Sequence, residues 1–303
     1  INCWWSISSK STRSIWSESH VVIPNYSMNS THIFHSWYSR VIAFILVIAC
    51  GYGIEILFAY TLNMFGISFL FMLFGMIGIE YARGGTYQTI GFPLDKNTMP
   101  DLFIGFMLGS IPIIMLIARL NVCDLCDITL TNNVMISGIF SIVIYAIVEE
   151  LLFRGMIFQA CVERFSFIPT AIVFSLVFAS AHVLNPSFDT LSMVNTFLAG
   201  LLFSYAWYHT RSLWLPIAIH IAWNLTLFVT GMTLSGIDSQ QSIFSVNIMD
   251  VNLTPWLHSR YGIEGTVYCT LMLLLMGFVI SKISVPPQRF ARLFHLEYRI
   301  HHA

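Results

Sequence analysis

The sequence predicts an all-α fold, a polytopic membrane helix bundle of about eight transmembrane helices with both termini cytoplasmic. The first observation is composition: of 303 residues, 56% are hydrophobic and 10% are charged, and the mean hydropathy is +0.75. A soluble domain carries about 25% charged residues, so this chain has too few to cover a surface that faces water. The second observation is that long apolar segments recur along the chain. Together they exclude a soluble globular enzyme, a disordered protein and a nucleic-acid-binding protein.

Eight segments come close to the roughly 20 apolar residues that a membrane-spanning helix needs. Because very few residues separate the first two segments, these should form a tight antiparallel hairpin. Together the segments form one transmembrane bundle, residues 41–284, with no internal repeat. In chain order they are residues 41–60, 64–82, 102–118, 133–159, 167–184, 191–208, 213–234 and 265–281.

The distribution of Lys and Arg predicts the orientation, since short cytoplasmic loops retain these residues. Apart from Arg154, eleven of them fall on the side of the amino terminus and only Arg119 and Arg260 on the other. The chain should therefore be a multi-pass protein of the cell membrane, with the lipid bilayer around it. Residues 1–40 form a polar segment, of which 1–27 are predicted to be dispensable. Residues 285–303 form a basic cytoplasmic tail that should lie against anionic lipid head groups.

Three charged residues stand inside the fourth segment, in the run IVEELLFRG from Ile147 to Gly155. Each charge near the middle of a membrane helix costs about 2.5–3.5 kcal/mol. Glu150 and Arg154 are four residues apart, so they share a helix face and should form an ion pair. Glu149 lies about 100° around the helix from Glu150 and should face a cavity instead. The structural alternative is an ion-pair cluster at a helix end, without a role in chemistry.

Two further helices carry polar side chains at a spacing of four residues. The fifth segment ends with Phe178 and His182, and the seventh carries His220 and Asn224. Singly, each of these is also typical of a hydrogen-bonded residue between packed helices. A carboxylate and a histidine can together take a proton from water, and a histidine and an amide on one helix face can stabilise an oxyanion. The set therefore favours hydrolysis of a peptide bond by activated water.

The three motifs are EExxxR at residues 149–154, FxxxH at 178–182 and HxxxN at 220–224. In this order, on successive apolar helices, they resemble the motifs of the CAAX protease and bacteriocin-processing family, an intramembrane protease family that includes the type II CAAX prenyl endopeptidase. The resemblance is densest over about residues 135–235, and the flanking sequence is closest to bacterial members.

The resemblance implies that Glu149 and His182 activate water and that His220 and Asn224 stabilise the oxyanion. The implied partner is a peptide or membrane-anchored protein substrate, as in peptide maturation or bacteriocin immunity. A site that needs no obligatory metal is favoured. The alternative is zinc held by Glu149, His182 and His220, with an open fourth position. Supporting positions in the motifs are Glu150, Arg154 and Phe178.

Two other functions use the same residues. A non-catalytic peptide-binding or bacteriocin-immunity protein would need only the pocket, and a proton-coupled transporter would need the intramembrane carboxylate and histidines. No inverted repeat supports the transporter. Cys123 and Cys126, in a loop predicted to be extracytoplasmic, fit unpaired or locally bridged cysteines better than a metal or redox site.

The depths of the two histidines conflict if all helices begin at one level. At about 1.5 Å per residue, His182 lies about 22 Å from the start of its segment and His220 about 10 Å from the start of its own. Convergence of the motifs therefore requires staggered helix starts or different segment boundaries.

Overall fold

The computed structural model describes residues 34, 36–62, 67–131, 136–238, 241–249 and 255–284. The chain divides into two units, residues 1–31 and 32–303, and every described residue belongs to the second unit. The predictions for residues 1–27 and for the tail at 285–303 lie outside the described residues.

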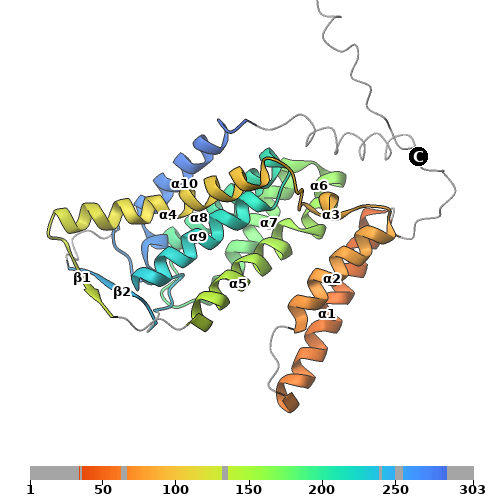
Figure 1. The fold of residues 1–303 in the computed structure, drawn as a ribbon, viewed down its shortest axis with the longest axis horizontal. Coiled ribbons are helices and arrows are strands. Elements are labelled where there is room, and N and C mark those ends of the chain that lie inside the picture. Colours follow the sequence, from red (N-terminus) through yellow and green to blue (C-terminus); the bar gives the residue numbers. More distant parts are fainter. Residues whose placement is uncertain are drawn as a thin grey trace, which may run out of the picture. The chain divides into compact units, whose positions relative to one another are not determined.

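The described chain is mostly helical (Figure 1). Each of the eight predicted segments contains a helix. Among the described residues, three stretches are long and apolar enough to cross a membrane, Trp37–Ile56, Thr98–Val122 and Ile136–Phe165, and several shorter apolar helices accompany them. The count of eight spans and the orientation of the termini stay predictions. The elements are α1 (Trp37–Leu62), α2 (Ile67–Ala82), α3 (Tyr87–Ile90), α4 (Thr98–Val122), β1 (Cys126–Leu130), α5 (Ile136–Arg154), α6 (Met156–Phe165), α7 (Phe167–Ala181), α8 (Thr190–Thr210), α9 (Trp214–Thr230), β2 (Phe244–Ile248), the 3₁₀ turn η2 (Ile263–Gly265) and α10 (Val267–Ile280).

The prediction of an all-α fold is wrong at β1 and β2, which form a two-stranded antiparallel sheet. The register pairs Cys126 with Ile248 and Leu130 with Phe244. Cys126 and Val246 are buried on the inner face, so the sheet has an apolar side to cover. The two cysteines of the CxxC sequence, Cys123 and Cys126, are both free thiols.

The fourth predicted segment is not one continuous helix, because the chain turns at Gly155 between α5 and α6. A Cβ atom at this position would lie 2.0 Å from the carbonyl oxygen of Leu151, so only glycine fits. α5 therefore ends at Arg154, directly after the first motif. The break sets how far the charged residues stand from the end of their helix.

Helix α9, which carries the third motif, packs closely against α4. Gly105 and Gly109 of α4 are spaced four residues apart, and Cβ atoms built on them would lie 2.6 Å from the Cβ of Ala218 and 2.4 Å from the carbonyl oxygen of Ile219. Small residues at this spacing allow membrane helices to approach each other closely. The contact fixes the position of α9 against α4.

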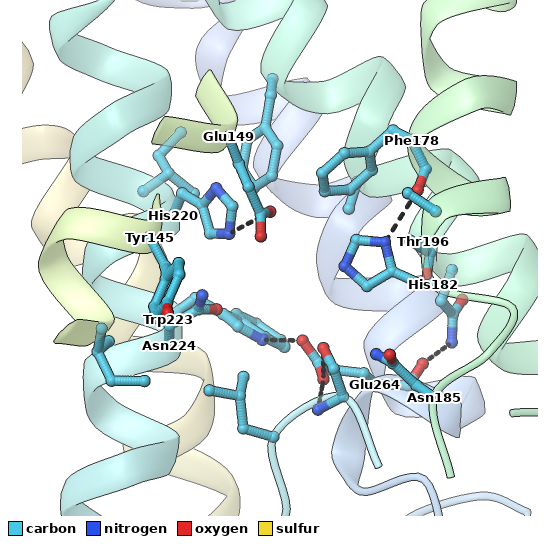
Figure 2. Close-up of a pocket in the computed structure, with 18 of the residues that line it drawn as sticks. Tyr145, Glu149, Phe178, His182, Asn185, Thr196, His220, Trp223, Asn224 and Glu264 are labelled. Carbon is cyan, nitrogen blue, oxygen red and sulfur yellow. Dashed lines mark hydrogen bonds and ion pairs between the residues drawn. The ribbon is translucent and has the colours of Figure 1, made fainter. Parts of the chain in front are cut away.

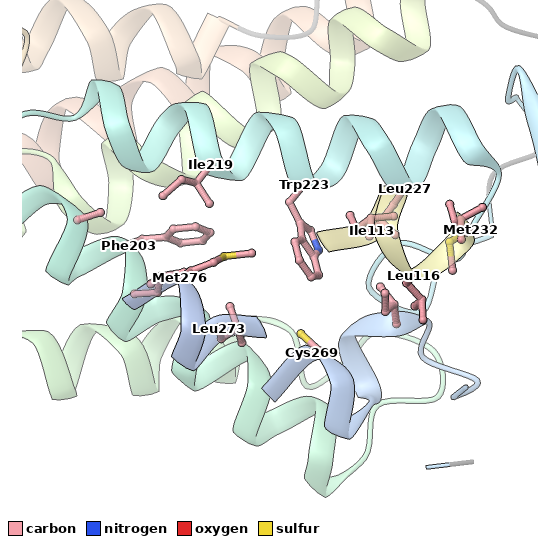
Figure 3. Close-up of a cluster of buried hydrophobic side chains, with 14 of the residues drawn as sticks. Ile113, Leu116, Phe203, Ile219, Trp223, Leu227, Met232, Cys269, Leu273 and Met276 are labelled. Carbon is pink, nitrogen blue, oxygen red and sulfur yellow. The ribbon is translucent and has the colours of Figure 1, made fainter. Parts of the chain in front are cut away.

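The apolar core lies between α9, α8, α10 and α4 (Figure 3). Ile219 and Trp223 of α9 point toward α8 and α10, and Leu227 lies beside Ile113 of α4. These buried side chains hold the helices that surround the polar residues described next. The labelled members of the core are Ile113, Leu116, Phe203, Ile219, Trp223, Leu227, Met232, Cys269, Leu273 and Met276.

Candidate active site

One cavity of about 770 Å³ is lined by residues of all three motifs (Figure 2). Glu149 comes from α5, His182 from the end of α7, and His220 and Asn224 from successive turns of α9. The structure therefore brings the four predicted catalytic residues to a single space. The rest of the wall includes apolar side chains of α8 and α10, among them Leu202, Phe203, Leu273 and Met276.

Glu150 and Arg154 form a fully buried ion pair behind the cavity. Nη1 of Arg154 donates to Oε1 of Glu150 at 3.1 Å, and both side chains are 0% exposed. Nη2 of Arg154 donates to the carbonyl oxygen of Gly200 at 2.9 Å, which ties α5 to α8. The guanidinium also lies over the rings of Phe178, at 4.8 Å, and Phe203, at 5.2 Å. These contacts offset the removal of the charge from water.

His220 links the two neighbouring glutamates. Its Nδ1 donates to Oε1 of Glu150 at 2.9 Å, and its Nε2 lies 3.7 Å from Oε2 of Glu149. The Glu149 side chain is 33% exposed and lines the cavity, in contrast to the buried Glu150. Phe203 stacks on the imidazole with ring centroids 4.9 Å apart. Glu150 and Phe203 therefore fix the ring, and its Nε2 faces Glu149.

His182 lies across the cavity from Glu149 and His220 in Figure 2. It caps the carboxyl end of α7, and its Nδ1 donates to the carbonyl oxygen of Phe178 at 2.8 Å. With a proton on Nδ1, the neutral ring has a lone pair on Nε2. Nε2 is therefore the atom of His182 that can accept a proton.

The alternative zinc set of Glu149, His182 and His220 is not assembled. Among the described residues, no group of three or more His, Cys, Asp or Glu side chains is close enough to hold a metal ion. Glu149 and His220 are neighbours, whereas His182 belongs to the opposite wall. These residues do not fit a three-ligand zinc site in this arrangement.

Glu264 is a further carboxylate in the cavity wall that the sequence motifs do not include. Its Oε1 accepts from the indole Nε1 of Trp223 at 3.2 Å. Its Oε2 accepts from the backbone N–H and the hydroxyl of Ser235, at 2.5 and 2.9 Å. Burial raises the pKa of the Glu264 carboxyl above its usual range, although hydrogen bonds from Ser235 oppose the shift.

The backbone of Glu264 is also held. Its carbonyl oxygen accepts from Nδ2 of Asn195 at 2.8 Å, which joins α8 to η2. No local pattern marks Glu264, because it stands in a short 3₁₀ turn before α10. Asn195 begins the stretch 195–200, and Thr196 and Ala199 of the same stretch also line the cavity.

Comparison with known proteins gives one match, to a family model. Residues 131–226 match the family model described as Rce1-like, type II CAAX prenyl endopeptidase. This segment, about a third of the chain, is similar to that family. The match covers α5 and extends into α9, so it includes all three motifs, and the resemblance inferred from them is confirmed. The Rce1-like family points to a CAAX protease, a hydrolase, and with the three long apolar helices it indicates a membrane protein. No curated protein and no solved structure gives a significant match.

Proposed function

We propose that this chain is an intramembrane endopeptidase, which hydrolyses a peptide bond of a membrane-associated protein or peptide in the cell membrane. The observation that carries the proposal is the convergence of Glu149, His182, His220 and Asn224 on one cavity. The Glu150–Arg154 pair holds His220 from behind, because Nδ1 of His220 donates to Glu150. The Rce1-like match over the same residues supports the same class of reaction.

In the proposed reaction, Glu149 and His182 act on one water molecule. Both side chains line the cavity, from opposite walls, and the proposed step takes place when one water molecule is held between them and donates a hydrogen bond to each. One of them takes its proton as the oxygen attacks the peptide carbonyl. General base assistance of this kind contributes about 10² to 10⁴ in rate.

His220 and Asn224 are proposed to stabilise the oxyanion of the tetrahedral intermediate. In its imidazolium form His220 has a second N–H, on Nε2, and the amide of Asn224 is one helical turn further along α9. Both donors are on one rigid helix, which preorganises them for the developing charge. Losing one such donor costs about 3–4 kcal/mol of transition-state stabilisation.

The test is cleavage by the purified chain reconstituted in lipid. Two quenched fluorescent peptides serve as substrates, one ending in a farnesylated CAAX sequence and one in the same sequence without the lipid. Comparative proteomics of peptides released from membranes, wild type against Glu149→Ala, searches for other substrates. We expect cleavage by the wild type, and a loss of kcat of about 10²-fold or more in Glu149→Gln and His182→Ala.

The matched control is Asp127→Asn, which removes the charge of an exposed carboxylate on β1, outside the cavity. It should leave kcat and KM unchanged. A chelator should also leave turnover unchanged, because the proposed steps use only side chains of this chain. Normal turnover by Glu149→Gln excludes the proposed base. If no peptide is ever cleaved, the non-catalytic peptide-binding alternative replaces the proposal.

A further inference from the structure

A second cavity, of about 440 Å³, lies beside strand β2. Four consecutive residues of the strand line it, Ser245, Val246, Asn247 and Ile248. Successive side chains of a strand point to opposite faces, so a cavity that contacts all four borders the edge of the strand. More than half of its lining residues have polar side chains, including Thr233, Ser242 and His258, which suits a peptide better than a lipid chain.

The register shows which backbone groups face this edge. Thr131 N–H donates to the carbonyl oxygen of Ile243, and Met249 N–H donates to that of Leu125. Antiparallel pairs alternate between hydrogen-bonded and non-hydrogen-bonded residues, so the odd-numbered residues of β2 direct their backbone groups at β1. The N–H and C=O groups of Val246 and Ile248 therefore point to the other edge, toward the cavity.

The second cavity adjoins the catalytic one. Asp238 lines both, and Thr233 of the second cavity donates to its Oδ1 at 2.5 Å. Met232 and Thr233 belong to the second cavity, whereas the next residues, Leu234 and Ser235, belong to the catalytic cavity. One short segment thus forms the boundary of both spaces.

We infer that the edge of β2 that faces the second cavity is a substrate subsite, at which an extended segment of the peptide substrate pairs with Val246 and Ile248 as a third strand. This inference rests on the proposed function. The segment is the one on the amino-terminal side of the cleaved bond. Adding a strand to an open sheet edge is an established mode of peptide binding, in which main-chain hydrogen bonds supply the affinity.

The first test compares the farnesylated CAAX peptide with the same peptide extended by six residues on its amino-terminal side. The extension should raise kcat/KM about tenfold or more, because several hydrogen bonds of about 1 kcal/mol each are added. N-methylation of the extension, one residue at a time, should reduce this gain at alternate positions only. Equal kcat/KM for both lengths, or an effect without alternation, overturns the inference.

A matched pair of variants locates the effect on β2. Ser245 lines the second cavity, and Thr129 is its direct partner on β1, on the same face of the sheet but outside the cavity. Ser245→Trp should obstruct the second cavity. It should therefore bring the ratio of kcat/KM for the long and short peptides close to one. Thr129→Trp should leave this ratio as in the wild type. If both variants lower this ratio equally, the effect is not specific to the second cavity and the inference is contradicted.

Cross-linking separates this inference from the proposed function. A benzophenone group in the extension of the peptide should label residues 241–249 of the chain, in the wild type and in Glu149→Gln alike. Labelling there without any cleavage contradicts the endopeptidase and supports the subsite. Cleavage with no labelling of residues 241–249 overturns the subsite and leaves the endopeptidase standing.

Discussion

At the scale of single residues, one oxygen atom organises the site. Oε1 of Glu150 accepts hydrogen bonds from both Arg154 and His220, although all three side chains are buried. Removing one partner of a buried pair costs about 3–5 kcal/mol, because a charge is left uncompensated. Glu150 therefore couples the stability of α5 to the orientation of His220. The neighbouring Glu149 takes no part in the Glu150–Arg154 ion pair and lines the cavity.

Glu264 gives a prediction for pH dependence. Its pKa is raised by burial from an ordinary value of 4.5, so the folded state holds the proton to a higher pH than the unfolded state does. The resulting stabilisation is complete below pH 4.5 and is lost as pH rises through the raised pKa. We therefore expect the Tm of the wild type to fall relative to that of Glu264→Gln between pH 4.5 and neutral pH, measured by thermal unfolding in detergent.

The Gln variant also changes the hydrogen bonds to Trp223 and Ser235, but that loss is a nearly constant offset in Tm. Only the slope against pH reports the titration. Parallel Tm curves for the two proteins would show that Glu264 titrates alike in the folded and unfolded states. A rise of the wild-type curve relative to the variant would reverse the sign of the proposed shift.

At the scale of elements, α9 is the helix on which the site depends. It carries His220, Trp223 and Asn224 on the side of the cavity and packs on the glycines of α4 with its other side. Such close contact leaves no room for a side chain between the two backbones. The position of the proposed oxyanion donors is therefore set by a contact on the far side of their own helix.

Gly109→Ala tests this dependence. The added Cβ would lie 2.4 Å from the carbonyl oxygen of Ile219 and 2.8 Å from the backbone nitrogen of Trp223, so α9 must move. We expect the free energy of unfolding to fall by about 1–3 kcal/mol, as in overpacked cores, and kcat to fall with it. Thermal unfolding and the peptide cleavage assay measure the two effects.

The matched control is Gly78→Ala in α2, where an added Cβ meets nothing within 4 Å. This change should leave kcat unaltered and stabilise the helix by up to about 1 kcal/mol, since alanine is the better helix former. Equal effects of the two substitutions would mean that the α4–α9 contact does not control the site.

At the scale of the whole molecule, the predicted orientation places the loop after α4 outside the cell. Cys123 is a partly exposed free thiol in this loop, and Cys126 is buried in β1. Burial also raises the pKa of the Cys126 thiol, so less of its reactive thiolate is present. A membrane-impermeant maleimide added to intact cells should therefore label Cys123 and leave Cys126 mostly unlabelled.

Cys123→Ser should abolish most of this labelling, as read by the mass shift of the purified protein. Labelling that requires permeabilised cells would reverse the orientation predicted from the Lys and Arg distribution. The cleavage chemistry would be unaffected by that outcome, because it depends only on residues that face one another inside the bundle.

The amino-acid sequence by itself determined the membrane class, the three motifs and the division between the Glu150–Arg154 pair and Glu149. Composition and helical periodicity are local properties, so the side chains that share a helix face can be derived from spacing alone. The matched family model lies over the same segment of the chain. The roles of the individual residues in catalysis stay predictions.

Only the tertiary structure decided the strand pairing, the turn at Gly155, the place of Glu264 and the depths of the two histidines. His182 stands at the carboxyl end of α7, whereas His220 is less than two turns from the start of α9, yet both line one cavity, so the two helices start at different depths. Such relations join residues that are distant in the chain. They follow from how helices pack, and packing depends on shapes and contacts that no local pattern records.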